Sequence, residues 1–206
     1  TGFTSDPGAE TNDYGDGSSD DIRSSTLAFD KSIVGTDQPH TSGQNVAIGE
    51  VITYSVAVTV PQGTTNSVVV TDLLDTGLAF IGVESISAGP SVTWTTPVTP
   101  SYAGGGTRMV LPLGTVVNTD TDKAVDEAIT VVYQAIVLNT GPNQRGITRT
   151  NGVDVSWVSG ALTDTTTDFT IVEPTLSIVK TIAPDTDIQA FEPLTITFTL
   201  THTAAS

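Results

Sequence analysis

The chain has 206 residues, of which 7 are basic and 23 are acidic, giving a formal net charge of −16. This charge excludes nucleic acid and anionic membrane surfaces as partners, because phosphate groups and an acidic protein repel one another. No apolar run is long enough to cross a bilayer. There is no cysteine, so an exported protein of this sequence needs core packing, a metal or another crosslink to hold its fold. The single methionine, Met109, is not the first residue, which favours a portion of a longer protein.

Residues 1–25 are rich in Gly, Ser and Asp and poor in apolar residues, which predicts an acidic linker or arm. Two acidic groups are weak candidates for calcium ligands, although neither matches the spacing of an EF-hand loop. The first group is Asp13, Asp16, Asp20 and Asp21, and the second is Asp120, Asp122, Asp126 and Glu127. No other metal or cofactor is indicated.

From residue 26 onward, runs rich in Val, Thr and Ile alternate with Gly, Pro, Asn and Asp, and no segment shows helical periodicity. Short strands at this density predict an all-β, immunoglobulin-like β-sandwich. The predicted strands are Thr26–Val34, Val51–Val60, Ser67–Leu73, Leu78–Ile86, Ile129–Leu138, Thr148–Val158 and Asp168–Val172, with weaker ones at Val92–Thr95 and Arg108–Leu113.

The chain contains an internal repeat. TLAFDKSIVGTDQ, from Thr26, aligns with TLSIVKTIAPDTD, from Thr175, so Lys31 corresponds to Lys180. GEVITYSVAV aligns with FEPLTITFTL, and there Glu50 corresponds to Glu192. Repeats of domain size predict a string of modules. We therefore expect one sandwich at 26–173 and the first strands of a second, incomplete module at 174–206.

Three polar residues share faces with apolar ones. Because side chains alternate along a strand, the first strand points Lys31 inward with Leu27 and Phe29. By the same reasoning Asp72 in an early-middle strand and Asn151 in a late strand point inward. The alternative for the lysine is that it reaches solvent from the strand end. The aromatic residues, Tyr54 and Tyr133 among them, are interpreted as core.

An amine, a carboxyl and a carboxamide in one apolar interior can react with one another. Burial favours a neutral, nucleophilic Lys31 and a protonated Asp72. Asp72 can then polarise the carbonyl of Asn151 and shuttle protons while an amide forms and ammonia leaves. Glu50 is a rival for the acid, since it is in phase with the apolar residues of its own strand and recurs in the repeat.

The residues also resemble a known family. The stretches LAFDKSIVGT, IGEVITYSVAVTVP, VVVTDLLDTGLAF and TRTNGVDVSW resemble the fimbrial isopeptide-forming domains of the D2 or collagen-adhesin A type and the related DUF11 surface repeat. In those families a lysine lies in the first strand, an aspartate in a strand that runs into a T-D-x-L-x-x-G-L turn, and an asparagine near the end. The resemblance implies that these roles fall on Lys31, Asp72 and Asn151.

These observations predict a structural spacer of a bacterial cell-surface adhesin or fimbria-like protein, not an enzyme acting on external substrates. Its expected partners are neighbouring repeats, with any host or matrix ligand bound by other domains. Two alternatives stay open. One is a filament subunit whose incomplete module is completed by strands of a neighbouring chain. The other is a glycan- or protein-binding domain that uses the loops around Pro90–Gly106.

Overall fold

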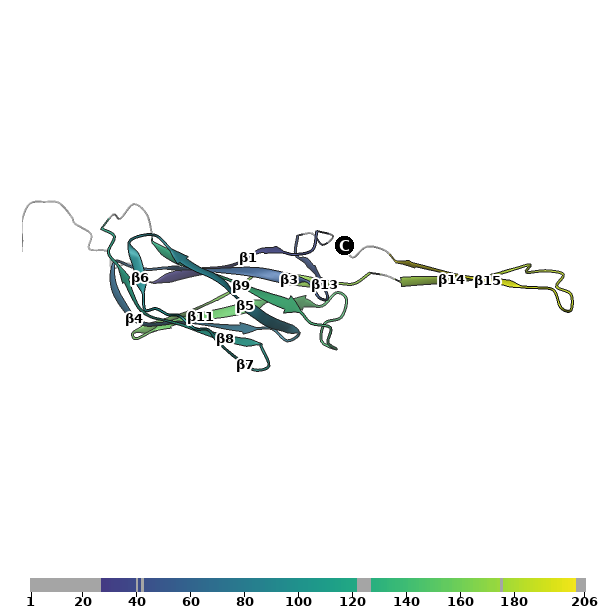
Figure 1. Ribbon diagram of the computed structural model, residues 1–206. Coiled ribbons are helices and arrows are strands. Elements are labelled where there is room, and N and C mark those ends of the chain that lie inside the picture. Colours follow the sequence, from purple (N-terminus) through teal and green to yellow (C-terminus); the bar gives the residue numbers. More distant parts are fainter. Residues whose placement is uncertain (1–26, 40, 42, 122–126, 175, 203–206) are drawn as a thin grey trace, which may run out of the picture.

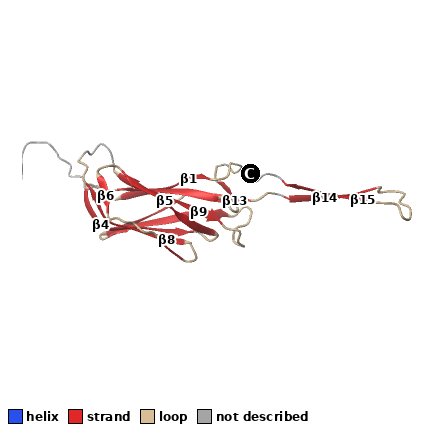
Figure 2. Cartoon of the chain, in the orientation of Figure 1, coloured by secondary structure: helices blue, strands red, loops and turns tan. Residues whose placement is uncertain are grey.

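The computed structural model describes residues 27–39, 41, 43–121, 127–174 and 176–202. Within these ranges every regular element is a strand (Figure 2). The predicted all-β class is therefore confirmed. No helix in the described ranges is available to cross a membrane.

Two main layers form an antiparallel sandwich (Figure 1). The first sheet has the order β1-β3-β9-β5, and the second has the order β12-β11-β4-β8-β6 with β7 paired to β8. The strands of the first sheet are β1 (Ala28–Thr36), β3 (Val51–Thr59), β9 (Ala128–Val137) and β5 (Leu78–Ala88). Those of the second are β12 (Gly160–Thr165), β11 (Asn151–Trp157), β4 (Gly63–Leu74), β8 (Arg108–Asn118), β6 (Val92–Trp94) and β7 (Ser101–Ala103). A smaller sheet contains β10 (Thr148–Arg149), β13 (Phe169–Val172) and β2 (Asn45–Ala47).

The core lies between the two main sheets. Burial alternates along β3 and β9, the two central strands of the first sheet. Because successive side chains of a strand point to opposite faces, this alternation gives the first sheet one apolar inner face. The second sheet contributes the facing half of the same buried cluster, including Val68, Val70, Leu111, Leu113, Val153 and Val155.

The strand bounds differ from the sequence prediction in three ways. The weak candidate at 108–113 continues to residue 118, and the predicted strand 148–158 divides into β10 and β11. Three strands were not predicted, namely β2, β7 and β12. β2 and β7 are very short, and β12 (GALTDT) is an edge strand without apolar alternation. Its pairing with β11, from Gly152–Thr165 to Trp157–Gly160, defines it.

A two-stranded hairpin of β14 (Leu176–Ala183) and β15 (Thr195–His202) extends away from the sandwich (Figure 1). Its register matches that of β1 and β3. Lys31 lies opposite Val56, six positions after Glu50, and Lys180 lies opposite Phe198, six positions after Glu192. Whereas β1 and β3 contribute to a closed core, every residue of the hairpin strands is exposed.

Candidate functional site

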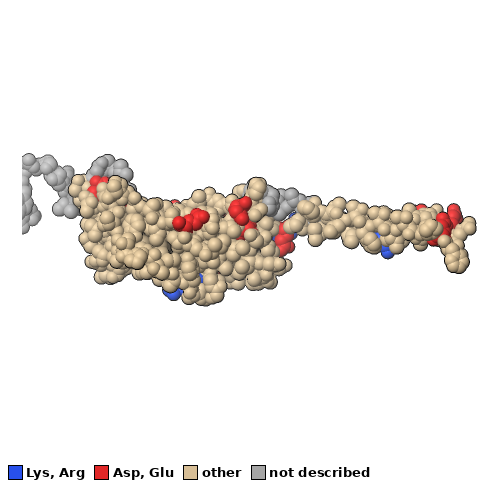
Figure 3. Space-filling model, viewed as in Figure 1, with Lys and Arg blue, Asp and Glu red and all other residues tan. Residues whose placement is uncertain are grey.

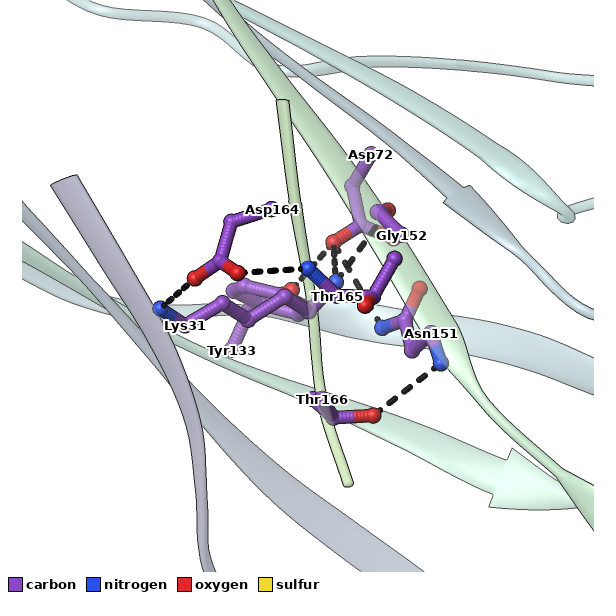
Figure 4. A network of polar contacts seen from close by, with 8 residues as sticks. All are labelled: Lys31, Asp72, Tyr133, Asn151, Gly152, Asp164, Thr165 and Thr166. Carbon is purple, nitrogen blue, oxygen red and sulfur yellow. Dashed lines mark hydrogen bonds and ion pairs between the residues drawn. The ribbon is translucent and has the colours of Figure 1, made fainter. Parts of the chain in front are cut away.

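Lys31 lies in β1, an edge strand of the first sheet, and its side chain is fully buried. Its Nζ donates a hydrogen bond to Oδ2 of Asp72 and another, of 3.2 Å, to the carbonyl oxygen of Gly152 (Figure 4). The same nitrogen lies 5.3 Å from the ring centre of Tyr54 and 5.6 Å from that of Tyr133. The amine therefore points into the sandwich between aromatic rings and does not reach solvent at the strand end.

Asp72 and Asn151 lie on adjacent strands of the second sheet. Asp72 of β4 lies opposite Val153 of β11, so both point to the same inner face. Asn151 is two residues before Val153 in β11 and therefore points to that face as well. Its Nδ2 lies 3.5 Å from Asp72 Oδ2, the oxygen that also accepts from Lys31. Three side chains from β1, β4 and β11 thus meet at one carboxyl group (Figure 4). Asp72 Oδ1 and Asn151 Oδ1 are buried without a hydrogen-bond partner among the described residues.

Burial shifts both ionisable groups toward their neutral forms. Desolvation lowers the pKa of the Lys31 amine to about 8, against an opposing effect of the Asp72 and Asp164 carboxylates. Desolvation likewise raises the pKa of Asp72, and the hydrogen bonds from Lys31, Tyr133 and Asn151 oppose that rise. A neutral amine and a neutral carboxyl are therefore accessible near neutral pH, which is the state required for acyl transfer to an amine.

Tyr133 belongs to the site as well as to the core. Its hydroxyl donates to Asp72 Oδ2, and its ring stacks on Tyr54 with centres 5.5 Å apart. Burial raises the pKa of the Tyr133 hydroxyl, so it remains a donor at physiological pH. The sequence interpretation of Tyr133 as core missed this contact. The available signal was its inward phase in β9, which also applies to ordinary core tyrosines.

Glu50 lies elsewhere. Its carboxylate accepts from Thr41 Oγ1 at 2.7 Å and from the backbone nitrogen of Ala47 at 2.6 Å, so it closes the turn between β2 and β3. Residue 56, opposite Lys31, is six positions further along β3, which corresponds to roughly 20 Å of extended strand. Glu192 makes the same contact in the hairpin, where it accepts from the backbone nitrogen of Gln189 at 3.0 Å.

The calcium candidates are only partly covered by the structure. Asp13, Asp16, Asp20, Asp21, Asp122 and Asp126 lie outside the described residues. Of the second acidic group, Asp120 and Glu127 are described, and a hydrogen bond between their side chains raises the pKa of Glu127. Over residues 27–39, 41, 43–121, 127–174 and 176–202, no cluster of three or more His, Asp or Glu side chains is arranged to hold a metal ion.

An open groove of about 750 Å³ lies beside the turn between β4 and β5. Its walls include Leu73, Asp75, Leu138 and Pro142. The groove is therefore not lined by the loops at 90–106 that the binding alternative requires. On the face shown in Figure 3, the charged side chains of the sandwich are scattered.

Comparison with solved structures finds folds of the same kind in major pilins. A 35 kDa C-terminal fragment of the major pilin GBS80 of Streptococcus agalactiae is 9% identical, with a TM-score of 0.50 over 75% of this chain and 58% of that chain. The full-length major pilin SpaD of Corynebacterium diphtheriae is 18% identical, with a TM-score of 0.48 over 78% of this chain and 39% of that chain. BcpA, the major pilin subunit of Bacillus cereus, is 16% identical, with a TM-score of 0.46 over 75% and 42%.

This chain spans less than two thirds of each of those pilin chains. At such low identities the likeness concerns the fold alone. No family model matches the sequence, and no curated protein matches it.

Proposed function

We propose that this chain is a structural spacer module of a bacterial cell-surface fimbria or adhesin, and that a self-made amide bond between Lys31 and Asn151 closes its sandwich. The observation that carries the proposal is the convergence of Lys31 Nζ and Asn151 Nδ2 on one buried carboxyl oxygen of Asp72. Nucleophile, acid and acyl group come from three different strands. No substrate from outside is needed, so the reaction is a single self-modification and the module is not an enzyme.

The proposed reaction begins with transfer of a proton from the Lys31 ammonium to Asp72. Rotation of the Asn151 carboxamide then turns its unpaired Oδ1 toward the protonated carboxyl, which donates to it and polarises the carbonyl. Lys31 Nζ attacks Cγ, and a carbon–nitrogen bond forms. Asp72 passes one proton from Nζ to Nδ2, the Cγ–Nδ2 bond breaks, and ammonia leaves. The product is a neutral amide, and Asp72 ends as it was before the attack.

The geometry supports a mechanical role for the bond. Lys31 belongs to the first strand of the sandwich, and Asn151 begins a late strand of the opposite sheet. A covalent link between them would carry tension directly from one sheet to the other. Without it, the load would fall on hydrogen bonds and core packing, which separate one after another. Resistance to heat and protease follows from the same link, because it restricts the unfolded chain.

Three further features agree with a place in an extended surface filament. The fold is shared with a fragment of a major pilin. The motifs around Lys31, Asp72 and Asn151 resemble fimbrial isopeptide domains and DUF11 repeats. The register of β14 and β15 repeats that of β1 and β3, which supports a module boundary near residue 174 and neighbouring repeats as the partners.

The test is the intact mass of the purified, denatured chain. We expect a mass short by one ammonia, and the full mass in Lys31→Ala and in Asp72→Ala. Lys180→Ala is the matched control, since Lys180 is the equivalent lysine of the exposed hairpin and should leave the mass deficit unchanged. A wild-type chain with its full mass would remove the bond from the proposal and leave a plain β-sandwich spacer.

The hairpin favours a second candidate, a filament subunit completed by a neighbouring chain. One of its faces carries Leu176, Ile178, Ile182, Ile196, Phe198 and Leu200, all exposed. In the sandwich, β3 is the equivalent of β15, and it pairs with β9 on the edge that does not face β1. Sedimentation over a range of concentrations decides this candidate. Growth into polymers that stops when Ile178 and Phe198 are changed to Ser would support it, and a monomer at all concentrations would exclude it.

A further inference from the structure

The segment from Asp164 to Thr166, at the end of β12, contacts the backbones of both proposed reaction partners (Figure 4). Asp164 Oδ2 accepts from the backbone nitrogen of Lys31 at 2.8 Å. Thr166 Oγ1 accepts from the backbone nitrogen of Asn151 at 3.1 Å, and the Thr166 nitrogen donates back to the Asn151 carbonyl at 3.0 Å. Asp164 therefore holds the backbone of β1, and Thr166, two positions later, holds the first residue of β11.

The register explains why Asp164 reaches β1. Val153 of β11 lies between Asp164 of β12 on one side and Asp72 of β4 on the other. Residues directly opposite one another in a sheet share a face, so Asp164 points inward, as Val153 and Asp72 do. Because β12 is the edge strand of its sheet, this inward side chain meets the edge strand β1 of the other sheet. Thus the backbone nitrogen of Lys31 donates to Asp164 and its amine donates to Asp72. These two aspartates lie on either side of Val153 in the second sheet.

The backbone contacts are themselves well supported. Asp164 Oδ1 accepts from the backbone nitrogen of Thr165 at 2.8 Å, which fixes the carboxylate against its own strand. Thr166 is buried, with 5% of its surface exposed. An edge strand such as β1 presents backbone groups that its own sheet does not pair. The contact from Asp164 satisfies one of them and joins the open edges of the two sheets beside the site.

We propose that Asp164 and Thr166 are positioning residues for the crosslinking reaction, which hold the Lys31 and Asn151 backbones at the separation that lets Nζ reach Cγ. The inference rests on the proposed function. Neither residue touches the reacting atoms, and both act through the strand that carries the reacting side chain. Displacement by about 1 Å can slow a reaction between held groups by roughly 100-fold, so a small relaxation of β1 would register in the rate.

The charge of Asp164 gives it a second, separable effect. The groups that face Lys31 are Asp72 from β4, Tyr133 from β9, Tyr54 from β3 and Asp164 from β12. The Asp164 carboxylate favours the protonated amine and so raises the pKa of Lys31. The single oxygen of Asn at this position can accept from the Lys31 backbone nitrogen, but Asn gives up the contact of the second oxygen with the Thr165 nitrogen and lacks the negative charge. Replacement by Asn therefore separates the hydrogen bond from the electrostatic effect.

The experiment follows the loss of ammonia by intact mass after unreacted chain, recovered from inclusion bodies in urea, is diluted into folding buffers of increasing pH. We expect Asp164→Ala and Thr166→Val to crosslink roughly 10- to 100-fold more slowly than wild type. Thr166→Ser should restore the rate, since it returns the hydroxyl. Asp164→Asn should keep the rate near its optimum and move the alkaline fall of the rate to lower pH. Thr163→Val is the matched control, because Thr163 bonds Asp154 on the exposed face of the same hairpin, and it should react like wild type.

The outcomes separate this inference from the function on which it rests. A wild-type chain that keeps its full mass overturns both. A wild-type chain that loses ammonia, with Asp164→Ala and Thr166→Val reacting at the same rate, overturns the positioning role alone. So does a Thr163→Val variant slowed as much as Thr166→Val, because the effect would then be one of general stability. If Asp164→Ala does not fold, Thr166→Val and its comparison with Thr166→Ser decide, and a Thr166→Val rate equal to that of wild type overturns the positioning role.

Discussion

Replacing Lys31 with Met removes the nucleophile and retains most of the buried stem. Met is unbranched and adapts to irregular core space, so the packing loss is small. Asp72 keeps its hydrogen bond from Tyr133 and can stay protonated in the apolar interior. The main expected loss is therefore the crosslink itself. The two linked residues are 120 positions apart (151 − 31 = 120), and the chain-entropy relation for a loop of that length gives about 5 kcal/mol of stability.

For a domain of this size, about 5 kcal/mol corresponds to a fall in Tm of roughly 10–20 °C. Scanning calorimetry of wild type and Lys31→Met, each checked by intact mass, measures the difference. Lys180→Met is the control and should change Tm little, because Lys180 is exposed. The reasoning is refuted if wild type is short by one ammonia and Lys31→Met nevertheless unfolds at the same temperature. The crosslink would then contribute nothing to the folded module.

Three further predictions concern the same site. The rate of ammonia loss should be bell-shaped in pH, because the reaction needs one proton shared between Lys31 and Asp72. The rate should fall above pH about 8, where the pair loses that proton, and in acid, where both groups are protonated. Tyr133→Phe removes a hydrogen bond that opposes the rise in the pKa of Asp72, so the acid limb of that profile should move to higher pH; an unmoved limb would exclude a role for the hydroxyl. Glu50→Gln should still lose ammonia in mass spectra, but its free energy of unfolding in urea titration should fall by about 1–3 kcal/mol, because the substitution weakens a buried, hydrogen-bonded turn. A Glu50→Gln chain with its full mass would instead make Glu50 the acid.

The inward phase of the proposed site residues follows from the sequence because it is a local property. Side chains alternate with a period of two, so the apolar neighbours of Lys31, Asp72 and Asn151 already place these three residues on inner faces. The all-β class and most of the strands follow from the same alternation and from turn residues. The weak strand at 108–113 and the unpredicted β12 show the limit of prediction from local alternation. Their bounds depend on pairing with distant strands, which no local pattern encodes.

Only the tertiary structure decides which inward residues meet. Glu50 and Asp72 are both buried acids. Register within the first sheet puts Glu50 at a turn, six positions away from the residue opposite Lys31. The packing of the second sheet against the first puts Asp72 beside Lys31. The contacts of Tyr133, Asp164 and Thr166 likewise depend on how the two sheets face each other. Sequence alternation fixes the face of a side chain, because the backbone geometry of a strand is the same everywhere. Register and the packing of sheets fix its neighbours, and these are set by contacts between residues far apart in the chain.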